Sequence, residues 1–174
     1  MMKDNNKWVA CWGNATSITN RREAIYAKDL TLRYPVRMCF SGSMLRFRFS
    51  NLTGTEPVTL NKVFVGHTPI TFAGETSITL LPGKETESDA VSYAVSRGDT
   101  IEVSFYMAGF TQMNSGTLVT GPLSKGYYAY GDYAEADELP LNLTRNTNWF
   151  YFLNTIDVLT SAENQGKERV GGRQ

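Results

Sequence analysis

Histidine is the side chain that most often moves protons near neutral pH, and this chain has a single one, His67. It lies in Val65-Gly66-His67-Thr68-Pro69, which is typical of a turn after a strand, and no aspartate stands three residues before it. A serine nucleophile needs such a base beside it, yet no serine lies in a Gly-x-Ser-x-Gly elbow. Gly98-Asp99-Thr100 resembles a Gly-Asp-Ser block only superficially, because it offers threonine and precedes an alternating strand. We therefore expect an exposed loop histidine, a hairpin turn at residue 98 and no catalytic residue.

Metal and phosphate sites are equally hard to assemble from these residues. Two cysteines and one histidine do not supply the four ligands of a zinc site. The acidic residues Asp132, Glu135, Asp137 and Glu138 offer oxygens suited to calcium, but they lack the alternating spacing and the turn glycine of a calcium loop. The chain also contains no Gly-x-Gly-x-x-Gly pattern and no Walker-type loop. We expect a solvated acidic loop, no metal ion and no cofactor.

The two cysteines, Cys11 and Cys39, allow two interpretations. The neighbours in Met38-Cys39-Phe40 are apolar, which favours a small buried hydrophobic residue over a disulfide partner, with a disulfide as the alternative. The N-terminal residues 1–12 contain no apolar run of signal-peptide length, so we expect a cytoplasmic protein.

The most suggestive candidates for binding are aromatic. Tyr127, Tyr128, Tyr130 and Tyr133 crowd a glycine-containing stretch, and rings with a polar tip stack on sugars or fill protein interfaces. Three interpretations stay open for them: packing in the core or at its rim, an interface with another domain, and a platform for carbohydrate. No pair of carboxylates stands out as the acid and base of a glycosidase.

The elements that must position these residues are predicted to be strands. In the segment 44–50, Leu45, Phe47 and Phe49 alternate with Arg46 and Arg48, which indicates one buried and one wet face, with the arginines solvated or paired across strands. The segment 100–107 alternates in the same way, and turn signals separate it from weaker runs at 29–37, 58–65, 77–81, 90–95 and 149–159. We expect an all-β fold, an antiparallel, jelly-roll-like β-sandwich. At most two short helices are expected, at 20–28 and 133–138, and mostly loops at 111–140.

Composition bounds the partners and the domain organisation. Seventeen basic and seventeen acidic residues give no net charge, so the positive field that nucleic-acid binding requires is absent. No apolar stretch reaches 18 residues, so we expect no membrane partner. A chain of 174 residues suits one core, and we expect a single sandwich domain over residues 1–160 and a polar tail over 161–174.

Several strand motifs, taken in order, resemble the N-terminal β domain of two-domain GDSL/SGNH-type esterases. The resemblance covers about residues 7 to 160. The segments that carry it are Trp8 to Ala15, Leu30 to Arg33, Leu45 to Asn51, Glu56 to Leu60, Ile78 to Gly83, Gly98 to Ser104 and Trp149 to Leu153. Each motif is mostly strand and turn sequence, and it is their order and spacing that match.

In that family the β domain is joined to a hydrolase domain that carries the Gly-Asp-Ser nucleophile, the oxyanion-hole residues and a late Asp-x-x-His. No position of this sequence matches those blocks, so the resemblance transfers no catalytic residue. It implies a non-catalytic accessory domain that packs beside an SGNH hydrolase domain and shapes substrate access, or that self-associates through an exposed apolar face. The alternative is a free-standing carbohydrate-binding module that uses the tyrosines at 127–133.

Overall fold

The structure is a computed structural model that describes residues 6–14, 17–18, 25–119 and 125–161. Throughout these residues the regular elements are β-strands and none is a helix, which confirms the all-β prediction. The helix expected at 133–138 is wrong, because this segment forms turns. The helix expected at 20–28 falls partly outside the described residues, and its later part contains the short strand β3 (Tyr26–Ala27).

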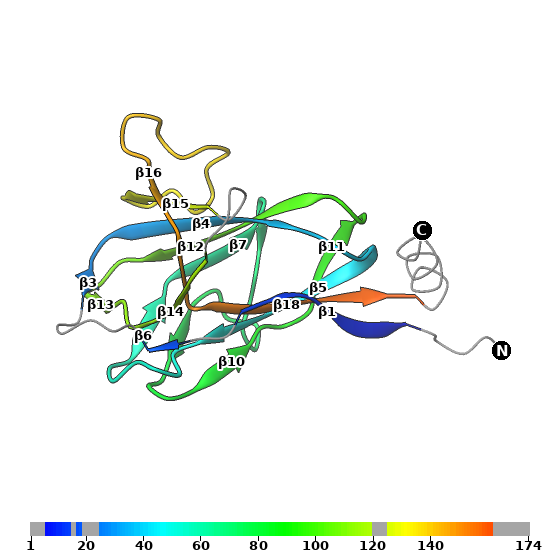
Figure 1. The fold of residues 1–174 in the computed structure, drawn as a ribbon, viewed down its shortest axis with the longest axis horizontal. Coiled ribbons are helices and arrows are strands. Elements are labelled where there is room, and N and C mark those ends of the chain that lie inside the picture. Colours follow the sequence, from blue (N-terminus) through cyan, green and yellow to red (C-terminus); the bar gives the residue numbers. More distant parts are fainter. Residues whose placement is uncertain (1–5, 15–16, 19–24, 120–124, 162–174) are drawn as a thin grey trace.

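Two antiparallel sheets form the body of the molecule, one above the other in Figure 1. The first sheet has the order β1-β18-β5-β10, and β11 also pairs with β5. Its strands are β1 (Lys7–Gly13), β18 (Leu153–Thr160), β5 (Gly42–Ser50), β10 (Glu85–Glu87) and β11 (Val91–Val95). The second sheet comprises, in order, β16 (Arg145–Thr147), β15 (Gly126–Tyr130), β4 (Leu30–Arg37), β12 (Thr100–Met107), β7 (Lys62–Val65) and β8 (Thr68–Pro69).

Three smaller ladders accompany the two sheets. They pair β13 (Thr111–Gln112) with β3, β6 (Val58–Leu60) with β9 (Ile78–Leu80), and β14 (Ser115–Leu118) with both β17 (Trp149–Tyr151) and β2 (Ser17–Ile18). Figure 1 shows their labelled strands β3, β13, β14 and β6 toward one end of the sandwich. The segment 111–140, expected to be mostly loop, therefore contains β13, β14 and β15. Of these, β15 lies inside the second sheet between β16 and β4.

The core lies between the two sheets, where the predicted faces meet. Phe47 and Phe49 of β5 and Phe105 of β12 are fully buried, as the alternation predicted. The rings of Phe49 and Phe105 meet edge to face with centroids 5.5 Å apart, so the contact joins the sheets directly. Burial of such a side chain is worth about 1.5–3 kcal/mol, which makes this face the main source of stability.

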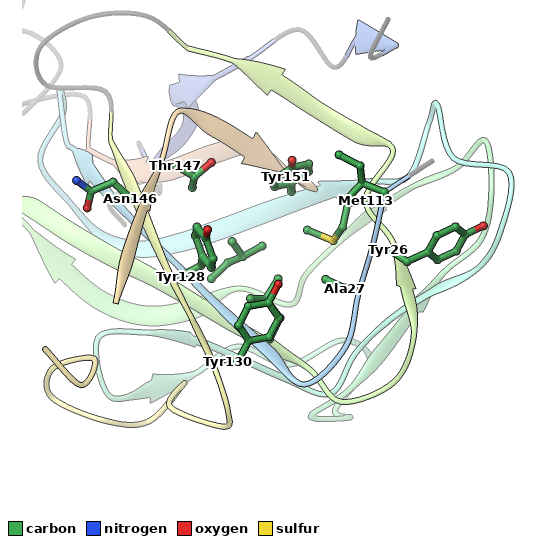
Figure 2. A pocket seen from close by; sticks show the side chains of 11 residues that line it. Tyr26, Ala27, Met113, Tyr128, Tyr130, Asn146, Thr147 and Tyr151 are labelled. Atoms are coloured by element: carbon green, nitrogen blue, oxygen red, sulfur yellow. The ribbon is translucent and has the colours of Figure 1, made fainter. Parts of the chain in front are cut away.

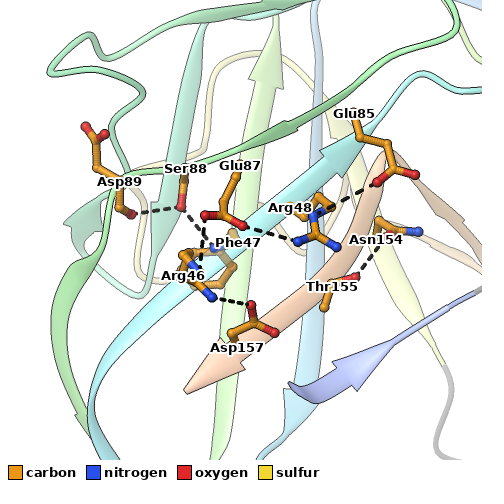
Figure 3. Close-up of polar contacts among 10 residues, drawn as sticks. All are labelled: Arg46, Phe47, Arg48, Glu85, Glu87, Ser88, Asp89, Asn154, Thr155 and Asp157. Atoms are coloured by element: carbon orange, nitrogen blue, oxygen red, sulfur yellow. Dashed lines mark hydrogen bonds and ion pairs between the residues drawn. The ribbon is translucent and has the colours of Figure 1, made fainter. Parts of the chain in front are cut away.

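The opposite face of β5 is polar and its charges are paired across strands, as Figure 3 shows. Arg46 lies 3.1 Å from Asp157 of β18 and 3.4 Å from Glu87 of β10, and its guanidinium sits 4.2 Å above the Trp8 ring. Arg48 also pairs with Glu87, at 3.2 Å. The prediction of cross-strand pairing is confirmed, and the pairing neutralises this face.

The outer face of the second sheet is covered by the connection from β15 to β16, residues 131–144. Arg33 of β4 lies beneath this connection and is only 5% exposed, so its charged end needs hydrogen-bond partners within the protein. The guanidinium donates to the carbonyls of Ala136 (2.7 Å), Asp137 (3.0 Å) and Tyr133 (3.2 Å), and its Nε donates to Ser104 Oγ at 2.7 Å. In a helix over 133–138 only the carbonyl of Tyr133 among these three would have a partner inside the helix, since the last four carbonyls of a helix have none. The turns present all three carbonyls to Arg33.

Candidate ligand pocket

A pocket of about 220 Å³ opens where β4 and β15 of the second sheet meet the small ladders of β3, β13 and β17. Figure 2 shows the rings of Tyr128, Tyr130 and Tyr151 around this space together with Met113, and Tyr26 farther out. We call it the tyrosine pocket. Its lining residues are Ile25, Tyr26, Ala27, Leu30, Leu32, Met113, Tyr128, Tyr130, Asn146, Thr147 and Tyr151.

The pairing of β15 with β4 decides which tyrosines enter the pocket. Tyr128 lies opposite Leu32 and Tyr130 lies opposite Leu30, and residues directly opposite in a sheet present their side chains on the same face. The two rings are perpendicular, with centroids 6.2 Å apart, and Tyr130 is 60% exposed. Tyr128 is therefore partly packed against the core, while the ring of Tyr130 is exposed to solvent.

Tyr151 is held in place by a buried tyrosine of the core. The hydroxyl of Tyr34 donates to the carbonyl of Trp149 and accepts the backbone N–H of Tyr151, both at 2.9 Å. Tyr34 is fully buried and stacks on Phe150 at 4.4 Å, and its burial raises the pKa of its hydroxyl, which stays protonated as a donor. This arrangement fixes the backbone of β17, and with it the wall of the pocket that Tyr151 forms.

The polar side chains that line the pocket are uncharged in the described residues. Asn146 and Thr147 of β16 supply an amide and a hydroxyl, and in the part of the chain that the structure describes the lining contains no Asp, Glu, Lys, Arg or His. Tyr26 donates its hydroxyl to the carboxylate of Glu56, and this hydrogen bond raises the pKa of Tyr26. The pocket therefore combines aromatic faces with uncharged donors and acceptors, a lining that suits a polar ligand without formal charge.

The four tyrosines predicted as one group are divided by the strand. Tyr128 and Tyr130 line the tyrosine pocket, whereas Tyr127 lies on the opposite face and lines a second hollow of about 360 Å³ with Arg33 and Asp137. The backbone of Tyr133 belongs to the covering connection, where its N–H donates to Thr31 Oγ1 at 3.0 Å and its carbonyl accepts from Arg33. The structure thus brings two of the four predicted residues together in this pocket and places the other two elsewhere.

Nine of the eleven lining residues were not predicted as site residues, among them the large side chains of Tyr26, Met113 and Tyr151. These three come from segments far apart in the sequence, and only the chain topology brings them beside β15. The one local signal was the aromatic run Trp149-Phe150-Tyr151-Phe152, in which the ring of Tyr151 stacks on that of Trp149 at 6.1 Å.

His67, the sole candidate base, pairs with an acid at the surface. Its Nε2 lies 2.6 Å from Asp137 Oδ1, with the two side chains 68% and 86% exposed. The expectation of an exposed loop histidine is confirmed. Among the described residues no serine or cysteine hydrogen-bonds to His67, so the pair has no nucleophile to activate in this part of the chain.

The other sequence candidates have structural partners. A turn lies at Gly98, where Asp99 accepts the backbone N–H of Ser96 at 2.8 Å, but the expected hairpin is wrong, because β11 belongs to the first sheet and β12 to the second. In the acidic loop, Asp132 lies 2.7 Å from Lys62 and Glu135 lies 3.9 Å from it. Within the described ranges no three His, Cys, Asp or Glu side chains are grouped to hold a metal ion.

Comparison with known proteins gives no family assignment, because neither a protein-family model nor a curated protein matches this chain. In the residues that the structure describes, no helix has the length and apolarity needed to cross a membrane.

Proposed function

We propose that this domain is a non-catalytic binding module that takes a neutral saccharide into the tyrosine pocket. The observation that carries the proposal is the convergence of Tyr128, Tyr130 and Tyr151 on one space, to which the described part of the chain adds no charged side chain. Sugar rings present apolar C–H faces that pack on aromatic rings, and hydroxyls that pair with uncharged donors and acceptors. Asn146 and Thr147 stand at the same pocket to supply such pairs.

The size and charge of the pocket narrow the ligand class. Sites for drug-sized molecules measure about 300–1,000 Å³, so a pocket of about 220 Å³ fits one ring or the end of a longer chain. A phosphate or carboxylate would find no arginine, lysine or histidine to bind it among the lining residues that the structure describes. A neutral sugar residue meets both conditions.

The test is titration of the purified chain with a panel of neutral mono- and oligosaccharides, followed by calorimetry or NMR. Tyr128→Ala is expected to weaken the best ligand at least about tenfold, because it removes one aromatic wall. Tyr127→Ala is the matched control, since Tyr127 is the adjacent residue of β15 and faces the other hollow. Its affinity is expected to match that of the wild type. Equal losses in both variants, or no binding by any glycan at millimolar concentration, would overturn the proposal.

A second candidate is the accessory domain that the sequence resemblance implies, packed beside an SGNH-type hydrolase domain. It is favoured by two large apolar side chains on the covering connection, Leu141 at 90% exposure and Leu143 at 45%. Arg33 holds the earlier part of this connection to the sheet, so the leucines are presented on a fixed base. In this proposal the two leucines form part of the apolar surface that the hydrolase domain would cover.

This second candidate is tested by mixing the chain with the isolated hydrolase domain of a two-domain SGNH esterase and measuring sedimentation. A complex is expected with the wild-type chain and none with Leu141→Asp, while Leu81→Asp, at another exposed leucine, serves as the control. Self-association of the wild type that Leu141→Asp abolishes would assign the surface to a second copy instead. Identical sedimentation of all three proteins, with no complex, would contradict this function.

A further inference from the structure

The two cysteines meet because strand β1 is irregular at one residue. Ala10 pairs with Asp157 and Trp12 with the preceding residue, Ile156, so Cys11 is an extra residue in the ladder. Such a bulge redirects a side chain away from the ordinary alternation of the strand. Here it brings Cys11 Sγ within 3.3 Å of Cys39 Sγ, on the connection between β4 and β5.

Both thiols lie where a soluble reagent reaches them. Cys39 is exposed, which corrects the expectation of a buried hydrophobic residue; its apolar neighbour Met38 is the one that is buried. Cys11 is half-buried and lines a surface hollow together with Trp12 and Asn14. The prediction that Cys39 serves as a small buried hydrophobic residue is therefore wrong.

Hydrogen bonds hold the two residues in register. The backbone N–H of Cys39 donates to Cys11 Sγ at 2.9 Å, and the thiol of Cys39 donates to the carbonyl of Cys11 at 3.0 Å. At 3.3 Å the two sulfur atoms lie closer than ordinary van der Waals contact. A disulfide bond of about 2.05 Å requires them to approach by little more than about 1 Å. Folding alone has thus brought together residues 28 apart in the chain.

The geometry points to a dithiol that small disulfides, of the glutathione disulfide class, convert to an intramolecular Cys11–Cys39 disulfide. The Cys39 thiolate attacks one sulfur of glutathione disulfide, forming a mixed disulfide and releasing one glutathione thiolate. The Cys11 thiolate then attacks Cys39 Sγ and displaces the second glutathione thiolate. The protein loses two electrons and two protons, and the reagent is reduced to two glutathione molecules.

The bond would join two parts of the sandwich that are otherwise separate in the chain. Strand β1 is the edge strand of the first sheet, and Cys39 lies on the connection that passes from the second sheet to the first. Cross-linking them closes a loop that includes β4 and stabilises the folded state by restricting the unfolded chain. The reduced protein therefore has a more weakly held edge strand than the oxidised one.

The test exposes the reduced full chain to glutathione disulfide and counts thiols, mass and size. Both thiols are expected to disappear, the mass to fall by two hydrogens, the chain to stay monomeric on a non-reducing gel, and excess glutathione to reverse every change. Peptide mapping should recover Cys11 and Cys39 in one linked fragment. Oxidation should raise the Tm by about 5–10 °C.

Cys11→Ser is the matched variant, because it keeps the exposed thiol and removes the resolving one. Its Cys39 is expected to retain glutathione as a stable mixed disulfide, with no rise in Tm. The inference is overturned if the wild type also stops at glutathione adducts, forms only links between chains, or keeps both thiols. Thiol counting and mass need no folded variant, so a Cys11→Ser protein that failed to fold would still leave the wild-type outcome decisive.

Discussion

Phe47 and Phe110 carry the same side chain in opposite surroundings. Phe47 is fully buried between the sheets, whereas Phe110 is 77% exposed, with its ring centroid 6.3 Å from that of Tyr26. Phe47→Ala is expected to lower the free energy of unfolding by about 3–5 kcal/mol, because it opens a cavity in packed surroundings. Phe110→Ala is expected to change it by less than about 0.5 kcal/mol.

Urea unfolding followed by circular dichroism measures both variants. Because both variants lose the same phenyl ring, the difference between their unfolding free energies measures the effect of burial. A cost below about 1 kcal/mol for Phe47→Ala would contradict the alternation assigned to β5. A cost for Phe110→Ala equal to that for Phe47→Ala would show that exposure does not predict the energy.

Among the elements, β5 and β12 were predictable because apolar and polar residues strictly alternate in them. Strand β15 was not, since Gly126-Tyr127-Tyr128-Ala129-Tyr130 places tyrosines on both faces and hides the period of two. The strands β13 and β14 are too short and too polar to give a pattern at all. For the same reason only part of the candidate site was predicted. The sequence pointed to the tyrosines of this segment, but it did not show that Tyr128 and Tyr130 lie on one face of β15 and Tyr127 on the other.

Arg33 decides the conformation of a whole connection. Arg33→Met is expected to destabilise the protein by about 2–4 kcal/mol, because it leaves buried carbonyls of residues 133–137 without their donor. Hydrogen exchange of the amides at 131–138 should quicken with it. Arg37→Met, at an exposed position of the same strand, is the control and should change neither quantity. Unchanged exchange at 131–138 in Arg33→Met would show that the connection folds without this anchor.

Asp89 holds the turn at 73–74 through its charge. Its carboxylate accepts the N–H groups of Gly74 (2.9 Å) and Ala73 (3.0 Å) and the hydroxyl of Thr71 (2.7 Å), and the bond to Gly74 is the main reason that the pKa of Asp89 is lowered. A carboxyl whose pKa is lower when folded stabilises the protein above its unfolded pKa of about 3.9. That contribution is lost as the pH falls through the folded value.

The stability of the wild type should therefore fall more steeply than that of Asp89→Asn as the pH drops below about 4. The measurement is the urea midpoint of both proteins from neutral pH downward. At neutral pH the wild type should be the more stable of the two, because asparagine offers one acceptor oxygen where aspartate offers two. Parallel curves over the whole range would mean that the charge of Asp89 is not linked to folding.

For the whole molecule, the two sheets share one core. Phe49 and Phe105 touch across it, and β4 and β5 are consecutive strands that belong to different sheets. If one sheet unfolds, the apolar face of the other is exposed to water. The remaining sheet then loses the apolar burial that offsets the conformational entropy of keeping its strands ordered. The single domain expected over residues 1–160 therefore predicts one cooperative unfolding transition rather than two.

The single transition can be tested with tryptophans that lie in different sheets. Trp8 and Trp12 belong to β1 of the first sheet, and Trp149 belongs to β17, which pairs with β14 in a smaller ladder. In a Trp149→Phe variant, fluorescence reports only the first sheet, and in a variant with Trp8→Phe and Trp12→Phe it reports only the ladder. Within each variant the fluorescence transition should coincide with the far-UV circular dichroism transition, because all strands unfold together. Comparing two probes inside one variant removes any stability change that the substitution itself brings. If the fluorescence of Trp149 changes at lower denaturant concentration than the circular dichroism signal, β17 and its Tyr151 unfold separately from the rest of the domain. Saccharide binding to the tyrosine pocket should then shift that first transition to higher denaturant concentration.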